Sequence, residues 1–224
     1  MVFDISMDSI GKLSLIDFIE KSFGIKFSEE QLTKFPTIRK MAEHIQNNKL
    51  FHKTEQDKGW TGDLKEDSDV ILPKTSAFLG PIVHAVRGAF RLSFSFEGKG
   101  MENIPEGPCF FAPNHETKLD AFLVLSYLDK NTLKNTFSYA KKEHVNSALR
   151  RYMASRSNVI VMDLSKDLKH SIQKMAEVVK QGKKILIFPE GTRTLDGEIG
   201  SFKKTYAILS AELNVPVVPV VIKG

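Results

Sequence analysis

Apolar residues recur at helical spacing through the first fifth of the chain and predict three short helices. The first pattern covers residues 9–24 and stops at Gly24, the second begins at Ser28, and the third covers 37–48 after Pro36. The stripe positions of the first and third helices are Ile10, Leu13, Ile16, Phe18, Ile19, Ile38, Met41, Ala42 and Ile45. We therefore expect a small all-helical module over residues 1–48.

The pattern then changes twice. Residues 49–75 are polar and charged, which predicts a linker. From residue 76 onward, helix and strand patterns alternate. The expected strands are 94–100, 108–113, 158–164, 184–188 and 215–222, and the expected helices are 76–92, 118–130, 166–183 and 203–213. This alternation predicts an α/β domain over 76–224, with a largely parallel sheet flanked by helices.

Composition is consistent with that division. The chain has 224 residues, of which 42% are hydrophobic and 26% are charged, as in folded domains. Its single cysteine, Cys109, excludes an internal disulfide and a cysteine metal cluster, and its place in an apolar strand predicts a core position in a reducing compartment. No apolar run approaches the roughly 20 residues that a membrane-spanning helix needs.

The positive charge is concentrated in the expected α/β domain. Residues 76–224 hold 21 basic and 14 acidic residues, a net charge of +7, whereas residues 1–50 are neutral and 51–75 carry −2. Such an excess suits a phosphate-bearing substrate or an anionic membrane surface. It is also compatible with an ordinary protein surface. The bases are scattered and form no known nucleic-acid motif, so we expect no nucleic-acid partner.

The first candidate site follows the expected strand 108–113. His115 and Asp120 are five residues apart, and they can meet if His115 lies in the turn before a helix and Asp120 in its first turn. Thr117 would then be the N-cap. The aspartate would fix the imidazole tautomer, leaving the other ring nitrogen to take a proton from a hydroxyl. The alternative is that Asp120 only caps the helix and His115 is a surface residue.

The second candidate site, residues 188–193, follows the expected strand 184–188. A glycine at a strand end, here Gly191, lets backbone amides turn toward an anion, and Arg193 adds a guanidinium that matches phosphate. An ordinary turn with a solvated arginine is the alternative.

Two further stretches carry weaker signals. The prolines in residues 215–222 indicate an edge strand, a bend or a cavity wall. Residues 76–92 place apolar side chains on one helical face beside Arg87 and Arg91, so this helix could lie among lipid headgroups or pack on the domain.

Taken together, His115 and Asp120 in NHETKLD, the stretch FPEGTRT and VPVVPVVI resemble the motifs of glycerolipid acyltransferases of the 1-acyl-glycerol-3-phosphate (HX4D) type, over about residues 90–224. The resemblance implies that His115 and Asp120 are catalytic, without a metal. It also implies that Glu190, Gly191, Thr192 and Arg193 bind the acceptor and its phosphate, and that Asn114, grouped with these residues, positions the first motif.

This sequence departs from the family pattern at three points. Asp163 and Leu164 stand where an arginine is usual, so one phosphate contact is missing or comes from another base. Thr205 replaces a common glycine, and the chain stops at Gly224, soon after the last motif. These departures favour a fragment or a short form.

Residues 8–45 resemble the later part of an acyl carrier protein, whose serine bears 4′-phosphopantetheine. The match places that serine at Ser9. A carrier before an acyltransferase is similar to the bacterial fusions of an acyl-activating ligase, a carrier and an acyltransferase.

We therefore expect transfer of a fatty acyl group from acyl carrier protein or coenzyme A to the hydroxyl of a lysophospholipid or lysophosphatidic acid. The expected location is the cytoplasm, peripherally at the inner face of the cell membrane. The alternative is a carrier or interaction fragment with an inactive acyltransferase-like domain.

Overall fold

The computed structural model describes residues 9–48, 64, 72–73, 75, 79–93, 96–162, 168–194 and 196–223. The chain divides into two compact units, one comprising residues 1–68 with 163–174 and the other comprising 69–162 with 175–224. Most of the predicted linker lies outside the described residues, so the boundaries at residues 48 and 76 remain predictions.

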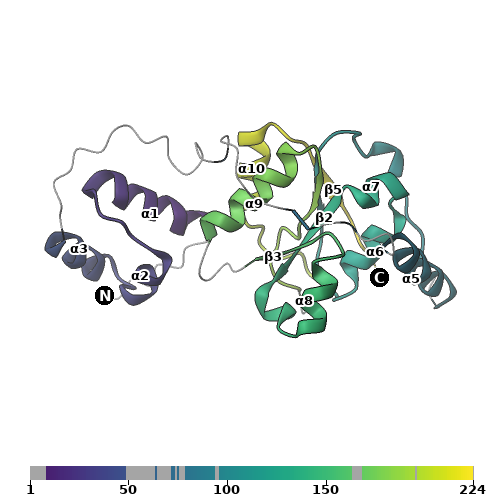
Figure 1. The fold of residues 1–224 in the computed structure, drawn as a ribbon, viewed down its shortest axis with the longest axis horizontal. Coiled ribbons are helices and arrows are strands. Elements are labelled where there is room, and N and C mark those ends of the chain that lie inside the picture. Colours follow the sequence, from purple (N-terminus) through teal and green to yellow (C-terminus); the bar gives the residue numbers. More distant parts are fainter. Residues whose placement is uncertain are drawn as a thin grey trace. The chain divides into compact units, whose positions relative to one another are not determined.

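The first unit contains the three expected helices, α1 (Ser9–Phe23), α2 (Glu29–Lys34) and α3 (Ile38–Asn47) (Figure 1). Gly24, at a φ of 66°, follows α1 and allows the chain to turn. The Ser28 hydroxyl and the Gln31 side chain cap α2 reciprocally, and Thr37 caps α3. The helix starts and stops are therefore encoded locally, as the sequence predicted.

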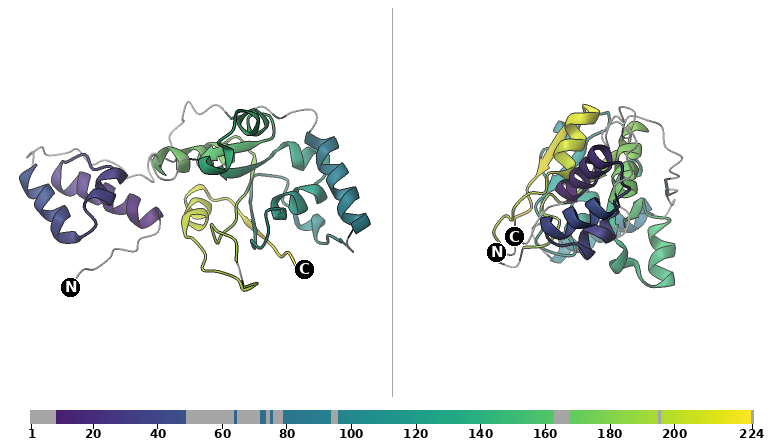
Figure 2. Two further views of the ribbon diagram at one scale, coloured as in Figure 1. Left: turned by 90° about the horizontal axis from the view of Figure 1, so that it is seen from below. Right: turned by 90° about the vertical axis from the view of Figure 1, so that its left-hand side faces the viewer.

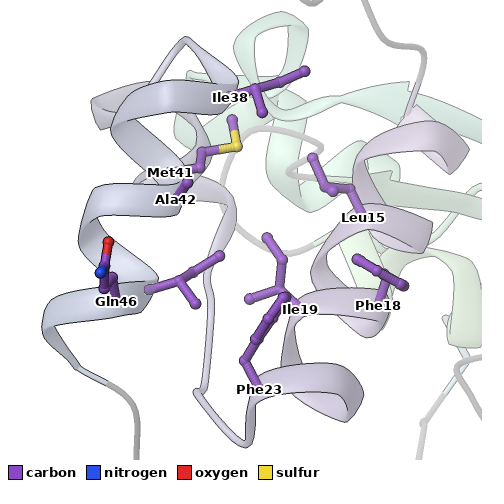
Figure 3. Close-up of a pocket in the computed structure, with 9 residues that line it drawn as sticks. Leu15, Phe18, Ile19, Phe23, Ile38, Met41, Ala42 and Gln46 are labelled. Carbon is purple, nitrogen blue, oxygen red and sulfur yellow. The ribbon is translucent and has the colours of Figure 1, made fainter.

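Between α1 and α3 the first unit has an open apolar groove of about 440 Å³ (Figure 3). Its floor shares Ile19, Met41 and Ile45 with the buried core of this unit. Phe18 and Ile38 line it while remaining 58% and 68% exposed. The helical unit thus leaves apolar surface uncovered beside its core.

The second unit is built on five parallel strands. They are β1 (Phe110–Pro113), β2 (Thr136–Lys141), β3 (Val159–Met162), β4 (Lys184–Leu186) and β5 (Val217–Val220). Their order across the sheet is β3-β2-β4-β1-β5, and every pairing is parallel. This confirms the predicted α/β class. It also places the proline-bearing strand β5 at an edge, where a missing N–H donor is tolerated.

Helices and short turns precede and connect these strands. They are α5 (Leu79–Ser93), η1 (Met101–Asn103), α6 (Asp120–Tyr127), α7 (Lys130–Lys134), η2 (Lys142–Val145), α8 (Ala148–Ala154), α9 (Leu168–Lys180) and α10 (Thr205–Leu213). The chain leaves β1 toward β2 and leaves β4 in the opposite direction, toward β5. With right-handed crossovers, the connections after these two neighbouring strands cover opposite faces of the sheet, so a topological switch point lies between β1 and β4.

The predictions and the structure differ at one expected strand that does not form and at one strand and two helices that were not predicted. Residues 96–100 of the expected strand 94–100 form no strand, because they pair with none of the five strands and contact Tyr127 instead. The Tyr127 hydroxyl donates to the carbonyl oxygen of Phe96, and a Cβ atom at Gly98 would approach the Tyr127 ring to 2.5 Å. Strand β2 was missed although it is central, because its sequence, TFSYAK, mixes polar and apolar residues. Helices α7 and α8 were also missed, since both are short.

Cys109 lies in the core of the second unit, as predicted. It is fully buried beside Phe111, Leu128 and Leu186. Burial raises the pKa of its thiol to about 11, against a smaller lowering effect of Lys184. The thiol is therefore protonated and unreactive at neutral pH.

Candidate active site

The two sequence-predicted motifs meet at the switch point between β1 and β4. His115 follows β1 by two residues, and the loop that begins at Phe188 follows β4. Parallel strands bring both segments to the carboxyl edge of the sheet, where ligands bind in open α/β folds. The loop after β4 and the end of the chain beyond β5 lie at one edge of this unit (Figure 2).

His115 and Asp120 are in contact, in the geometry that the sequence analysis required. His115 lies in the turn before α6, Asp120 is the first residue of that helix, and His115 Nδ1 is 3.0 Å from Asp120 Oδ2. The carboxylate is fully buried, whereas the imidazole keeps 21% of its side-chain surface exposed. A buried carboxylate therefore supports a ring that solvent or a substrate can reach.

The same carboxylate also organises the turn. Asp120 Oδ2 accepts the backbone N–H groups of Glu116 at 2.7 Å and Thr117 at 2.8 Å, and Oδ1 accepts the Thr117 hydroxyl at 2.5 Å. The predicted N-cap role of Thr117 was wrong, because α6 begins at Asp120 and Leu119 occupies the cap position. Thr117 instead accepts the Leu119 N–H and ties the turn to Asp120.

These contacts set the protonation of the pair. Burial raises the pKa of the Asp120 carboxyl group, but hydrogen bonds from the Thr117 hydroxyl, the His115 ring and two backbone amides together hold it below its usual range. An ionised carboxylate only accepts hydrogen bonds, so His115 Nδ1 carries the proton and Nε2 has a free lone pair. The ring stacks on Phe188, with 3.8 Å between centroids and 18° between planes, which fixes its orientation.

Glu190 is a second buried carboxylate, and it holds the backbone instead of a ring. It is only 4% exposed. Its Oε1 accepts the N–H of His115 at 2.8 Å, and its Oε2 accepts the N–H of Gly200 at 2.8 Å. Glu190 thus connects the turn that holds His115 to the loop after β4, and both of its oxygens are engaged within the protein.

Asn114 has a similar role toward the last strand. Its Oδ1 accepts the N–H of Ile222 at 2.7 Å, and its Nδ2 donates to the carbonyl oxygen of Ile222 and to Glu116 Oε1, each at 3.0 Å. The carbonyl oxygen of His115 accepts the N–H of Thr194 at 2.8 Å. The backbone around His115 is therefore anchored to the segment after β5 and to the loop after β4.

The remaining predicted phosphate-binding residues lie at the surface of that loop. Gly191 adopts a φ of 70°, which favours glycine, and Thr192 and Arg193 are exposed. The expected anion nest is not formed by the Gly191 amide, because that N–H donates to the carbonyl oxygen of Phe188 at 3.0 Å. Arg193 remains the cation nearest in sequence to this turn.

Lys203 is a basic residue that the sequence analysis did not assign. Its N–H donates to the carbonyl oxygen of Pro189 at 2.7 Å. Its stem covers Gly191, where a Cβ atom would lie 3.5 Å from Lys203 Cγ and 3.7 Å from Cε. The ammonium group therefore reaches the same turn as Arg193. The only sequence signal for it was the paired lysines in FKKT.

Some predicted positions fall outside the described residues. These are Asp163 and Leu164, most of the linker, and the side chain of Ser9, whose backbone begins α1. Within the described ranges, no group of three or more His, Cys, Asp and Glu side chains could hold a metal ion. No helix in the described part of the chain is long and apolar enough to cross a membrane.

The helix expected to contact lipid packs on its own domain through part of its apolar face. In α5, Val83 is 1% exposed and belongs to the core, while Val86 and Phe90 are half-buried. Arg87 and Arg91 lie over the Tyr127 ring, at 4.4 and 5.9 Å from its centroid. Ile82, on the same predicted face, is 54% exposed, and Phe78 and the side chain of Leu79 lie outside what the structure describes. Only part of this face is therefore used for packing.

The site and fold have recognisable relatives. The family described as "Acyltransferase" matches residues 95–223, more than half of the chain, and the family described as "Phosphopantetheine attachment site" matches residues 2–45. The chain belongs to the acyltransferase family, and His115, Asp120 and the loop after β4 all lie within the matched residues.

The relatives are named 1-acyl-sn-glycerol-3-phosphate acyltransferases and are longer than the region that matches this chain. The chain is 31% identical over 132 residues to the chloroplastic 1-acyl-sn-glycerol-3-phosphate acyltransferase BAT2 of Brassica napus, covering 56% of this chain and 36% of the relative. It is 28% identical over 128 residues to the 1-acyl-sn-glycerol-3-phosphate acyltransferase of Pseudomonas aeruginosa, covering 56% and 48%. The chain thus spans less than half the length of these relatives.

Among solved structures, a similar chain is the 1-acyl-sn-glycerophosphate acyltransferase PlsC from Thermotoga maritima. It is 25% identical, with a TM-score of 0.48, and the similarity covers 63% of this chain and 56% of that one.

Proposed function

We propose that this chain transfers a fatty acyl group from a thioester to the free hydroxyl of a lysophospholipid or lysophosphatidic acid. The observation that carries the proposal is the 3.0 Å contact between His115 Nδ1 and the buried carboxylate of Asp120, which leaves Nε2 of a partly exposed ring as the base. Membership of the acyltransferase family, and relatives named 1-acyl-sn-glycerol-3-phosphate acyltransferase, support this choice of acceptor.

The reaction begins with proton transfer from the acceptor hydroxyl to His115 Nε2. The hydroxyl oxygen attacks the thioester carbonyl carbon directly and forms a tetrahedral intermediate. When this collapses, the carbon–sulfur bond breaks, and the leaving thiolate takes the proton from the imidazolium ring. Asp120 stabilises that imidazolium from the Nδ1 side throughout. A thioester is already activated, so a base and correct positioning suffice for the step.

The acceptor's phosphate is bound at the turn after β4. Arg193 offers a guanidinium fork and Lys203 a second positive charge, which replaces the contact missing at position 163. Gly191 and Thr192 shape the turn. Glu190 and Asn114, whose side chains are engaged by backbone groups, position the catalytic turn and do not contact the acceptor.

The helical unit supplies the donor. Ser9 lies within the residues that match the phosphopantetheine attachment family, so it would bear 4′-phosphopantetheine, whose thiol carries the acyl group. Acyl coenzyme A presents the same thioester and is the second donor. A lipid acceptor places the reaction at a membrane surface, peripherally and on the cytoplasmic side.

A direct test is an acyl-transfer assay of the full chain with a panel of lysophospholipids and both donor types. We expect transfer to acceptors that carry a phosphate, and none to a monoacylglycerol that lacks it. Transfer that is indifferent to the phosphate would contradict the acceptor assignment, and no transfer to any acceptor would overturn the proposal.

The carrier role has its own test. After incubation with coenzyme A and a phosphopantetheinyl transferase, mass spectrometry should detect one phosphopantetheine addition in the native chain and none in Ser9→Ala. Ser14→Ala, which alters another serine of α1, is the matched control and should be modified normally. An unmodified native chain would exclude the carrier role and leave the acyltransferase proposal untouched.

A further inference from the structure

Helix α8 presents its large apolar side chains to solvent. Leu149, Tyr152 and Met153 are 68%, 62% and 55% exposed, and their i, i+3, i+4 spacing places them on one face. Only Ala154 of this helix is buried. An exposed apolar face of this kind on a short connecting helix is unusual, since apolar helix faces normally pack on the core.

The same helix is strongly basic. Arg150, Arg151 and Arg156 are all exposed, and the sequence contains no acidic residue from 144 to 162. Arg156 lies over the Tyr152 ring at 5.6 Å, and Arg150 has only a long contact of 3.5 Å to Asn146. None of the three arginines forms an ion pair within the described part of the chain. Their charges are therefore available to an anionic partner.

We propose that α8 is the surface by which the acyltransferase unit binds an anionic phospholipid surface. Exposed aromatic and aliphatic side chains flanked by unpaired arginines are the composition that binds at the headgroup boundary of anionic bilayers. This inference rests on the proposed function, which requires the enzyme to take its acceptor from lipid.

The position of α8 suits that role. It follows β2 through η2, and η2 leaves the sheet at its carboxyl edge, the edge that also carries His115. Only β4 separates β2 from β1, which corresponds to two strand spacings, or roughly 10 Å. A bilayer bound at α8 thus lies along the edge at which the acceptor must enter. In Figure 1, α8 stands clear of the strands at the margin of its unit.

Charge argues against the carrier module as the partner of α8. Residues 1–50 hold seven basic and seven acidic residues and offer no net attraction to three arginines. An anionic bilayer attracts every one of them.

The test is co-sedimentation of the full chain with vesicles of phosphatidylcholine containing phosphatidylglycerol, or of phosphatidylcholine alone. We expect the native chain to bind the anionic vesicles and to be released by salt. Leu149→Ser/Tyr152→Ser/Met153→Ser and Arg150→Gln/Arg151→Gln should each weaken that binding at least tenfold. Far-ultraviolet circular dichroism checks that both variants remain folded.

Matched controls replace equally exposed residues elsewhere in the same unit. These are Ile82→Ser/Leu92→Ser on α5 and Lys130→Gln/Lys134→Gln on α7, and both should bind like the native chain. Native binding by the two α8 variants, or equal loss in the controls, would overturn the proposal. A change of oligomeric state without a change in vesicle binding would overturn it too, because α8 would then be a contact between copies of the chain.

A second readout separates this inference from the proposed function. With a short-chain lysophosphatidic acid that is monomeric in solution, the α8 variants should transfer acyl groups at the native rate, and their loss should appear only with vesicle-borne acceptor. A native chain that binds anionic vesicles through α8 but acylates no acceptor would support the docking surface and refute the proposed function.

Discussion

Two buried carboxylates contact His115. Both accept hydrogen bonds, but from different parts of the residue. Asp120, fully buried, accepts two backbone N–H groups, a hydroxyl and the Nδ1–H of His115. Glu190, 4% exposed, accepts only backbone N–H groups, those of His115 and Gly200. Among the described residues, one carboxylate therefore contacts the ring that we propose as the base, and the other contacts only backbone groups, including that of His115 itself.

We infer from this difference that Asp120 acts on the proposed base itself, whereas Glu190 positions the turn that holds it. Removing the charge at Asp120 changes which nitrogen of His115 holds a proton, so it alters the base itself. Removing the charge at Glu190 leaves the tautomer unchanged and loosens the turn and the loop after β4. The two substitutions should then differ in the size of their effect and in the pH dependence of the remaining activity.

The largest effect is expected for Asp120→Asn. The amide can present an N–H to the ring, which then holds its proton on Nε2 and loses its function as a base, so kcat should fall by about 10²–10⁴-fold. Steady-state rates with saturating donor and acceptor measure this. Asp129→Asn is the matched control, because the Asp129 carboxylate also accepts backbone N–H groups at the start of a short helix but lies away from His115. A kcat within threefold of native for Asp120→Asn would show that the two carboxylates do not differ in role.

The difference in unfolding free energy between the native chain and the Asp120→Asn variant should depend on pH with a defined sign. Because the pKa of Asp120 is lower in the folded chain than in the unfolded chain, its carboxylate stabilises the fold above the ordinary carboxyl range. That contribution is lost as the pH falls through the folded value. Denaturant titrations at several pH values should therefore show that the difference in unfolding free energy between the native chain and the variant becomes smaller as the pH is lowered.

The next largest effect is expected at the turn held by Glu190. Arg193→Gln and Lys203→Gln each remove a charged hydrogen-bond donor, worth about 1.5–3 kcal/mol, so KM for a phosphate-bearing acceptor should rise about tenfold to a hundredfold. Lys204→Gln, also exposed and adjacent in sequence, is the control. A fall in kcat at unchanged KM would contradict this prediction, because these cations would then act in the reaction step and not in binding of the acceptor.

Glu190→Gln should have a smaller effect of a different kind. One of the two N–H groups loses its acceptor, which costs about 1–3 kcal/mol of unfolding free energy, and kcat should fall about tenfold because the turn is less well held. The pH optimum should stay at the native value, unlike that of Asp120→Asn. Glu198→Gln in the same loop is exposed and should match the native chain. A shifted pH profile for Glu190→Gln would contradict the positioning role, because it would show that Glu190 affects the protonation of the base.

The smallest effect is expected for Gly200→Ala. An added Cβ atom would lie 3.0 Å from Glu190 Oε2, so the carboxylate or the loop must move by a few tenths of an ångström, and kcat should fall severalfold. Gly107→Ala is the control, because nothing lies within 4 Å of a Cβ atom there. Equal rates for both variants would show that the loop does not need its present contact with Glu190.

The contacts that the sequence could indicate are local. The contact of His115 with Asp120 spans five residues and needs only a turn that leads into a helix, so the spacing gave the condition for it, although a surface position for His115 stayed open as the alternative. The helices of the first unit were predictable for the same reason, since Gly24, Ser28 and Thr37 mark their ends.

The roles that could not be predicted from the sequence depend on which strands are neighbours in the sheet. Glu190 meets His115 across 75 residues, and Asn114 meets Ile222 across 108, because β1 lies between β4 and β5. No pattern in the sequence gives that order, and the motif alone placed both residues in the phosphate site. The exposed face of α8 was missed because its apolar positions resemble those of any packed helix until burial is known.

The central claim is that His115 is the base of an acyl transfer, and His115→Ala tests it most directly. Acyl transfer from a radiolabelled thioester to lysophosphatidic acid should be measured for the native chain and the variant, beside His170→Ala, whose exposed histidine lies outside the site. With native-like circular dichroism in all three, we predict that His115→Ala loses about 10³-fold or more in rate, and that His170→Ala loses nothing. A folded His115→Ala variant that transfers acyl groups at the native rate would contradict the account.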